Sequence, residues 1–136
     1  MQHLHFNHWA ILVSALIQWF LGALWYSPAL FARPWMSMVF VRKDSSKKNS
    51  MILGMIASFI GSLVTSLMTA HVVIWSGASS YPAGMLIGFI LWLGFIAAPL
   101  AASYIYEGRP FNLFAINSGY WLAGLLITGG LLAVWR

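Results

Sequence analysis

The chain has 136 residues, of which 61% are hydrophobic and 7% are charged, and its mean hydropathy is +0.83. A soluble globular domain normally carries about 25% charged residues, so the composition excludes that class. Disorder is excluded too, because a disordered chain needs low hydrophobicity and high net charge. The composition therefore predicts a membrane protein that crosses the bilayer several times.

The positive charge of the chain is concentrated in one segment. The net charge is +5, and the sequence between Arg33 and Lys48 holds five of the seven Lys and Arg residues. A basic balance in a soluble protein suggests nucleic acid. A cationic cluster between long apolar segments instead indicates a topology determinant or a contact with lipid headgroups. We therefore expect a lipid bilayer as the partner, and no nucleic acid.

Four apolar segments are long enough to cross a bilayer as helices, which needs about 20 residues each. They cover residues 9–26, 52–74, 83–105 and 111–135. None shows the polar alternation of a barrel strand, and backbone groups in lipid must be paired within the segment. The predicted fold is all-α, with residues 1–136 forming one domain of four transmembrane helices. Short connections after the second and third segments predict an antiparallel bundle.

The first connection, residues 27–51, is the long one. Within it, residues 34–41 are apolar but too short to span, so we expect an interfacial segment lying on the membrane. Ser50 has the side chain of a helix N-cap and is predicted to begin the second helix. In the third segment, Pro99 lacks a backbone N–H and predicts a kink.

The distribution of Lys and Arg predicts the orientation, because these residues favour the cytoplasmic side. Four spans place the first and third loops on the same side. The cations of these two loops, which we assign to topology or headgroup contact, are Arg33, Arg42, Lys43, Lys47, Lys48 and Arg109. The opposite side has Arg136. We therefore expect a multi-pass protein of the cell membrane with both termini outside the cytoplasm.

Aromatic residues near the ends of the four segments predict belts at the two membrane surfaces. The residues assigned to these belts are Trp9, Trp25, Tyr26, Trp75, Tyr81, Tyr104, Tyr106 and Trp135. Small residues recur along three of the segments, which lets helices approach closely in lipid. These rows are Ser58, Ser62, Ser66 and Ala70; Gly84, Gly88, Gly94, Ala98 and Ala102; and Ala115, Gly119 and Ala123. The rows predict tight packing within a bundle or between copies of the chain.

Two histidines are candidates for a metal or cofactor site on the outer side. His8 precedes the first apolar segment, and His71 lies near the end of the second. Histidine is the commonest metal ligand and can also hold haem iron. One reading is therefore a site for a metal, a tetrapyrrole or a quinone near His8 and His71. The other reading is structural, with His71 hydrogen-bonded to a neighbouring helix.

Three polar residues inside the apolar segments are candidates for contact with a solute. These are Gln18 in the first segment and Asn117 and Tyr120 in the fourth. Polar side chains in lipid face the bundle interior or a cavity. They either coordinate a solute or ion, or form hydrogen bonds between helices, worth about 0.6 kcal/mol each on average.

The inventory of reactive groups argues against an enzyme. The chain has no cysteine, and Asp44 and Glu107 are its two acidic residues. Paired-carboxylate catalysis would have to use both. A Ser-His-Asp arrangement would have to join Asp44, on the inner side, to histidines that we expect outside. We therefore expect no catalytic activity.

Three motifs resemble one known family. They occupy residues 21–31 (LGALWYSPALF), residues 91–95 (LWLGF), and residues 106–120, which begin YEGRP and end INSGY. Their order and spacing resemble domain-of-unknown-function family 1761, small bacterial integral membrane proteins. The resemblance implies four membrane helices in a bacterial inner membrane. It implies no activity, substrate or cofactor.

Three functions follow from these patterns as hypotheses. The favoured one is an accessory or structural subunit, or a homo-oligomer, which packs through the small-residue faces. The alternative is an oligomeric transporter or channel for a small solute or ion. The third is a membrane subunit that binds a tetrapyrrole, quinone or metal.

Overall fold

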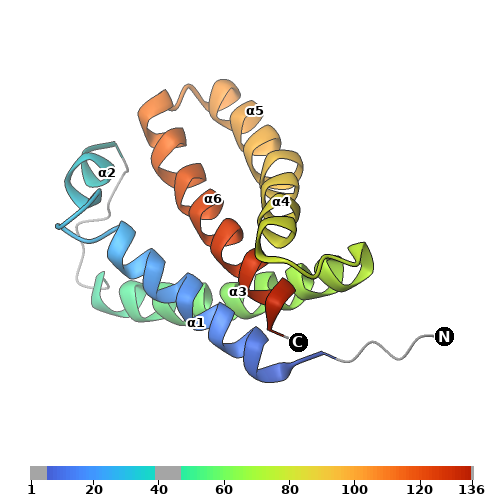
Figure 1. Ribbon diagram of the computed structural model, residues 1–136. Helices are drawn as coiled ribbons and strands as arrows, with labels where there is room; N and C mark the ends of the chain where they lie inside the picture. Colours follow the sequence, from blue (N-terminus) through green and yellow to red (C-terminus); the bar gives the residue numbers. More distant parts are fainter. Residues whose placement is uncertain (1–5, 39–46, 136) are drawn as a thin grey trace.

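The computed structural model describes residues 6–38 and 47–135 (Figure 1). Within these two ranges the chain is helical and contains no strand, which confirms the all-α prediction. Four helical stretches are long and apolar enough to cross a membrane. They are His8–Trp25, Met51–Ser76, Tyr81–Glu107 and Phe111–Val134, as expected for a multi-pass membrane protein.

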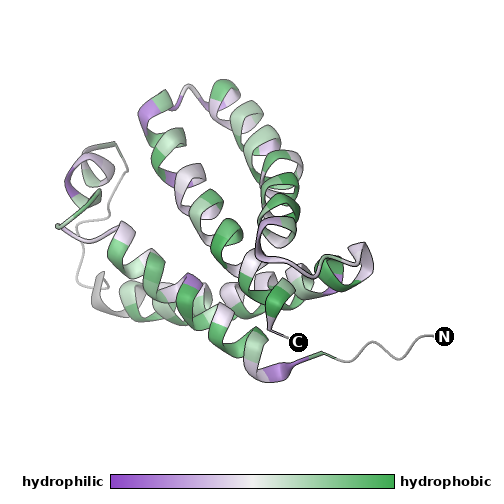
Figure 2. Cartoon of the chain, in the orientation of Figure 1, coloured by the Kyte–Doolittle hydropathy of each residue, from purple (hydrophilic) through white to green (hydrophobic). Residues whose placement is uncertain are grey.

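The helices follow one another in a simple order. They are α1 (His8–Trp25), α2 (Ala32–Met38), α3 (Lys47–Ser76), α4 (Tyr81–Trp92), the π-helical turn η1 (Leu93–Ala97), α5 (Ala98–Glu107) and α6 (Phe111–Val134). Figure 2 shows apolar residues along most of the long helices, whereas the short helix α2 is more hydrophilic.

Side-chain caps and two left-handed glycines set several helix ends. The side chain of Asn7 accepts hydrogen bonds from the N–H groups of Trp9 and Ala10, and Ser80 accepts one from Ala83. These bonds satisfy N–H groups that lack a partner inside the helix. Gly77 follows α3 with a φ of 73°, and Gly108 ends α5 with a φ of 66°. Only glycine adopts this conformation without steric cost.

The first connection is more helical than the sequence indicated. The helix α3 begins at Lys47, so Ser50 lies inside it and the prediction of an N-cap at Ser50 is wrong. Lysine is a good helix former, and α3 extends by one turn beyond the apolar segment. The short helix α2 covers residues 34–38 of the predicted interfacial segment. Residues 39–41 lie outside the described part of the chain.

The third apolar stretch is interrupted just before Pro99. The N–H of Ala98 donates to the carbonyl of Leu93, five residues earlier, which is the π-helical pattern. Pro99 has no N–H to donate and follows directly as a first-turn residue of α5. This π-helical turn, which holds one more residue than an α-helical turn, lies directly before Pro99, and the bend of the helix itself stays a prediction.

The helix α6 is the centre of the molecule. It contacts α1, α3, α4 and α5 and is flanked in Figure 1 by α1 with α3 and by α4 with α5. Half of the residues in an 18-residue apolar window of α6 are buried. In the corresponding windows of Met51–Ser76 and of Tyr81–Glu107, 11% of the residues are buried. The α3 and α4–α5 stretches therefore expose most of their apolar surface.

Small residues bring the helices around α6 close together. An added Cβ at Gly84 would overlap the backbone of Gly129, and one at Gly88 would overlap the backbone of Leu125. On α3, three of the four predicted row members are buried, and the Ser66 hydroxyl donates to the carbonyl of Ile11 at 2.8 Å. Parts of the predicted small-residue rows thus serve contacts within one chain.

Candidate functional site

The end of α1 is fastened to the N-terminal third of α6 by two aromatic side chains. The Trp25 indole Nε1 donates to the Ile116 carbonyl at 2.9 Å, and the Tyr26 hydroxyl donates to Asn117 Oδ1 at 2.7 Å. Both rings are partly buried. Both side chains thus turn inward to satisfy polar atoms of α6, and their place in a belt near the membrane surface stays a prediction.

The Asn117 side chain connects α1 to α5. Its Nδ2 donates to the Tyr104 hydroxyl at 2.7 Å, while its Oδ1 accepts from Tyr26. Tyr104 is 6% exposed and so is buried within the protein, and its belt position likewise stays a prediction. Burial, with the neighbouring Tyr120 and Tyr104, raises the pKa of Tyr26 well above its usual range. The Tyr26 hydroxyl therefore keeps the proton that it donates.

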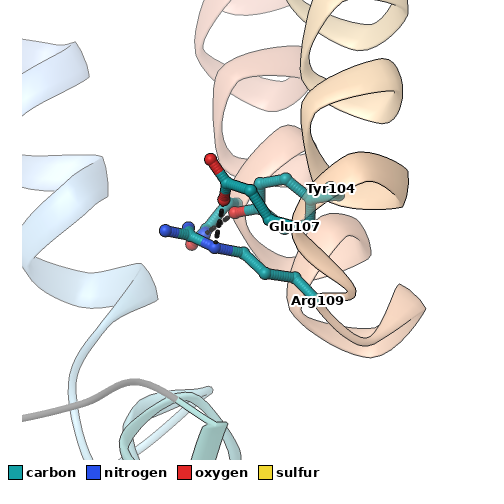
Figure 3. A network of polar contacts seen from close by, with 4 residues as sticks. Tyr104, Glu107 and Arg109 are labelled. Carbon is teal, nitrogen blue, oxygen red and sulfur yellow. Dashed lines mark hydrogen bonds and ion pairs between the residues drawn. The ribbon is translucent and has the colours of Figure 1, made fainter.

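An ion pair lies next to this network, in the connection between α5 and α6. Arg109 Nε is 2.7 Å from Glu107 Oε2, and the guanidinium lies 5.2 Å from the centre of the Tyr104 ring. Figure 3 shows these three side chains together, with the arginine beside the glutamate. Both charged side chains are about half exposed. The pair thus forms the solvent-facing end of the network.

Further along α6, Tyr120 makes a second contact with α1. Its hydroxyl donates to the Gln18 backbone carbonyl at 3.0 Å. Gly22 leaves room for the phenol, since an added Cβ there would lie 3.0 Å from the Tyr120 hydroxyl. The rings of Tyr26 and Tyr120 meet edge to face, with centres 5.7 Å apart. The two α6 contacts are therefore adjacent.

The Gln18 amide is buried without a hydrogen-bond partner. Its side chain is 1% exposed and lies beside the Tyr120 hydroxyl, but within residues 6–38 and 47–135 no well-oriented hydrogen bond is formed by Oε1 or Nε2. The Ser14 hydroxyl, one turn earlier on α1, is also buried and unpaired. Gly124 on α6 leaves the space that the Gln18 amide occupies. Leaving a buried amide unpaired costs on the order of 2–7 kcal/mol. The surroundings of Gln18 are therefore unusual for a polar side chain.

These groups form one series, which we call the polar column. It consists of Glu107, Arg109, Tyr104, Asn117, Tyr26, Tyr120, Gln18 and Ser14. It contains one carboxylate and one guanidinium, which pair with each other, and its remaining side chains are neutral at pH 7. The column offers hydrogen bonds to a polar ligand rather than a nucleophile and its base. All three predicted intramembrane polar residues belong to it.

The two candidate histidines differ in their surroundings. His8 is exposed as the first residue of α1. His71 is partly buried; its Nδ1 lies 2.8 Å from the Leu67 carbonyl, and its ring is 4.3 Å from that of Phe6. In residues 6–38 and 47–135, no three His, Asp or Glu residues gather as a metal-binding group. A metal, tetrapyrrole or quinone near His8 and His71 stays a prediction.

The predicted topology and headgroup residues are spread over three places. Arg33 is exposed on α2, and Arg109 belongs to the polar column. Lys47 and Lys48 are the first two residues of α3. Arg42 and Lys43 lie outside the described residues. Their proposed contact with headgroups stays a prediction.

A family model for a protein of unknown function, DUF1761, matches residues 9–133. The chain belongs to the DUF1761 family. No curated protein and no solved structure matches it.

In this DUF1761 protein, the first and last motifs of the sequence interlock. Gly22, Trp25 and Tyr26 of the first motif contact Asn117, Gly119 and Tyr120 of the last. An added Cβ at Gly119 would lie 3.3 Å from the Trp25 indole. The motifs thus describe how α1 is held against α6.

Several residues of the site were not identified from the sequence as site residues. Trp25, Tyr26 and Tyr104 looked like belt residues, and Ser14 was not singled out. Trp92 of the middle motif donates through Nε1 to the Ser118 carbonyl at 2.8 Å. The signal that pointed to most of them was their place inside the three motifs of this DUF1761 protein.

Proposed function

We propose that the protein is a membrane subunit that assembles with further copies of itself through the outer face of η1 and α5. The observation that carries this proposal is a row of small residues, Gly94, Ala98 and Ala102, which are all exposed. Nothing in the described chain lies within 4 Å of a Cβ added at Gly94. Small residues at this spacing let a second helix approach closely in lipid.

The proposal is supported by the contrast with the other small residues. Gly84 and Gly88 already pack against α6, and Ser62, Ser66 and Ala70 are buried. Of the ten residues of α5, all of them described, Tyr104 is the buried one. The row on η1 and α5 therefore has the character of a packing face but no helix of the same chain against it.

The absence of cysteine from the sequence allows a direct test. A disulfide needs two Cβ atoms about 3.5–4.5 Å apart, so Ala98→Cys should cross-link two chains in native membranes after mild oxidation. The control is Met68→Cys, which is 51% exposed on α3 and should stay monomeric. Ala98→Trp, combined with a mass measurement in mild detergent, should convert the oligomer to a monomer. A wild-type protein that is a monomer in mild detergent, or an Ala98→Cys variant that does not cross-link in native membranes, would contradict the proposal.

A second candidate function is a pathway for a small polar solute. The observation that favours it is the unpaired Gln18 amide beside the Ser14 hydroxyl. These groups supply donors and acceptors that no hydrogen bond within the described residues satisfies, as a binding step for a neutral solute requires. Neither proposal assigns catalysis, since Glu107, the acidic residue of the site, is paired with Arg109.

Vesicle shrinkage measured by stopped-flow light scattering tests the second function. Glycerol and urea are suitable probes, because both are small and neutral and carry donors and acceptors. The wild type should accelerate the permeation of at least one probe over protein-free vesicles, and Gln18→Met should abolish the gain. Equal rates with the wild type, the variant and protein-free vesicles would eliminate this candidate.

A further inference from the structure

A groove between α1 and α3 lies apart from the polar column. It has a volume of about 440 Å³ and is lined by Trp19 of α1 and by Ile52, Met55, Ile56 and Phe59 of α3. No polar surface is exposed in this lining. Its size falls within the range of small-ligand sites, roughly 300–1,000 Å³. The groove therefore fits an apolar occupant.

The shape of the groove is fixed by the Trp19 ring. The indole Nε1 donates to the Met55 carbonyl at 3.2 Å, and the ring meets Phe59 edge to face, with centres 5.6 Å apart. Ile52 and Ile56 are 49% and 54% exposed. The floor is thus held in place by a hydrogen bond and a ring contact, while residues 6–38 and 47–135 leave the wall on α3 largely uncovered.

Two lysines occupy the first positions of α3, the end of this helix that leads into the groove. The helix α3 begins with Lys47 and Lys48 and has no acidic residue in its first turn. Ile52 follows Lys47 by five residues, about 7.5 Å along the helix. Lysines beside a membrane attract anionic lipids. An amphiphile with an anionic head and an apolar chain matches this order of charge and apolar surface.

We infer that the groove holds one acyl chain of an anionic phospholipid, whose phosphate lies at the start of α3. The chain fills the space lined by Trp19 and Ile56, and the lysines select the headgroup. This site is separate from the small-residue row on η1 and α5 and from the polar column. It therefore stands whether or not the proposed assembly and the solute pathway do.

Native mass spectrometry of the full chain in mild detergent tests the inference. Phosphatidylglycerol and phosphatidylcholine with identical chains are added at equal concentration. At about 1 kcal/mol for each lysine, two lysines correspond to roughly a thirty-fold preference for phosphatidylglycerol. The variant carrying Lys47→Gln and Lys48→Gln should lose most of this preference and keep a weak binding of both lipids.

A second variant tests the groove itself. Ile56→Trp places a large ring in the space and should remove the binding of both lipids. The matched control is Val64→Trp, two turns further along α3 and 53% exposed, which should bind as the wild type does. Equal binding of the two lipids by the wild type would overturn the inference. So would lipid retention by Ile56→Trp, or a second protein chain in place of the lipid.

Discussion

The buried amide of Gln18 costs folding free energy, because it is removed from water without a well-oriented hydrogen bond in return. Its side chain is 1% exposed, and its amide has no well-oriented hydrogen bond within the described residues. The Ser14 hydroxyl is likewise buried and without a hydrogen-bond partner there. An apolar side chain of similar shape would avoid the loss of solvation that the amide suffers. A protein that keeps such a group gives up stability at that position, which is common where a site serves function.

Replacing Gln18 by methionine should therefore raise stability. Gln18→Met keeps the length of the side chain and removes the unpaired amide, and the free energy of unfolding should rise by about 1–3 kcal/mol. The measurement is equilibrium unfolding in mixed detergent micelles. A loss of stability would show that the amide is hydrogen-bonded in the native protein, for example to a bound water molecule.

Tyr26 gives a second test at this scale. Tyr26→Phe removes the donor to Asn117 Oδ1 and should lower the free energy of unfolding by about 0.6–1.7 kcal/mol, the range of hydrogen bonds between membrane helices. The control is Tyr106→Phe, since Tyr106 is 93% exposed. If the two variants are equally stable, the bond to Asn117 contributes nothing measurable.

The sequence identified part of the site and missed part of it for a physical reason. Gln18, Asn117 and Tyr120 were found because polar side chains in an apolar segment must face a protein interior. Tyr26 and Tyr104 were missed, since a tyrosine near a helix end suits a membrane surface as well as a buried hydrogen bond. Which of the two applies depends on the neighbouring helix, which composition and spacing do not place.

At the scale of elements, the contact between α4 and α6 depends on backbone proximity. Gly84 lies against the Gly129 backbone, and Gly88 against the Leu125 backbone. A side chain at either glycine cannot be accommodated by a rotamer change, because the neighbouring atoms are backbone. These two helices should therefore separate when the small residues are enlarged.

Gly84→Ala should destabilise the protein by about 3 kcal/mol, toward the upper end of the cost of overpacking. The control is Gly61→Ala on α3, which has open space around the added methyl. That change should leave stability unchanged or raise it by up to about 1 kcal/mol, since alanine is the better helix former. The two variants are compared by thermal unfolding in the same detergent. Equal melting temperatures would contradict the close approach of α4 and α6.

The elements themselves were largely predictable, because long apolar segments without charge form helices in lipid. The existence of all four was evident from hydropathy. The start of α3 at Lys47 was not, because the charged residues that end an apolar segment also favour helix. The π-turn at Leu93–Ala97 was anticipated only as a kink at Pro99. The type of distortion depends on backbone packing that one proline does not specify.

The whole molecule has a buried central helix and exposed outer helices. Half of the most apolar window of α6 is buried, whereas 11% of that of α3 is. In water such an apolar surface would drive aggregation. In a bilayer this surface contacts lipid or further protein chains. The proposed assembly face and the proposed lipid groove are both parts of it.

We propose, as the central claim, that the chain crosses the membrane four times, with the loop that holds Arg33 in the cytoplasm. Single-cysteine variants of the cysteine-free chain test it with a maleimide that does not cross membranes. Ser79, exposed between α3 and α4, and Arg33, exposed on α2, should lie on opposite sides. In intact cells Ser79→Cys should be labelled, and Arg33→Cys should be labelled only after permeabilisation. Labelling of both positions in intact cells would contradict the claim.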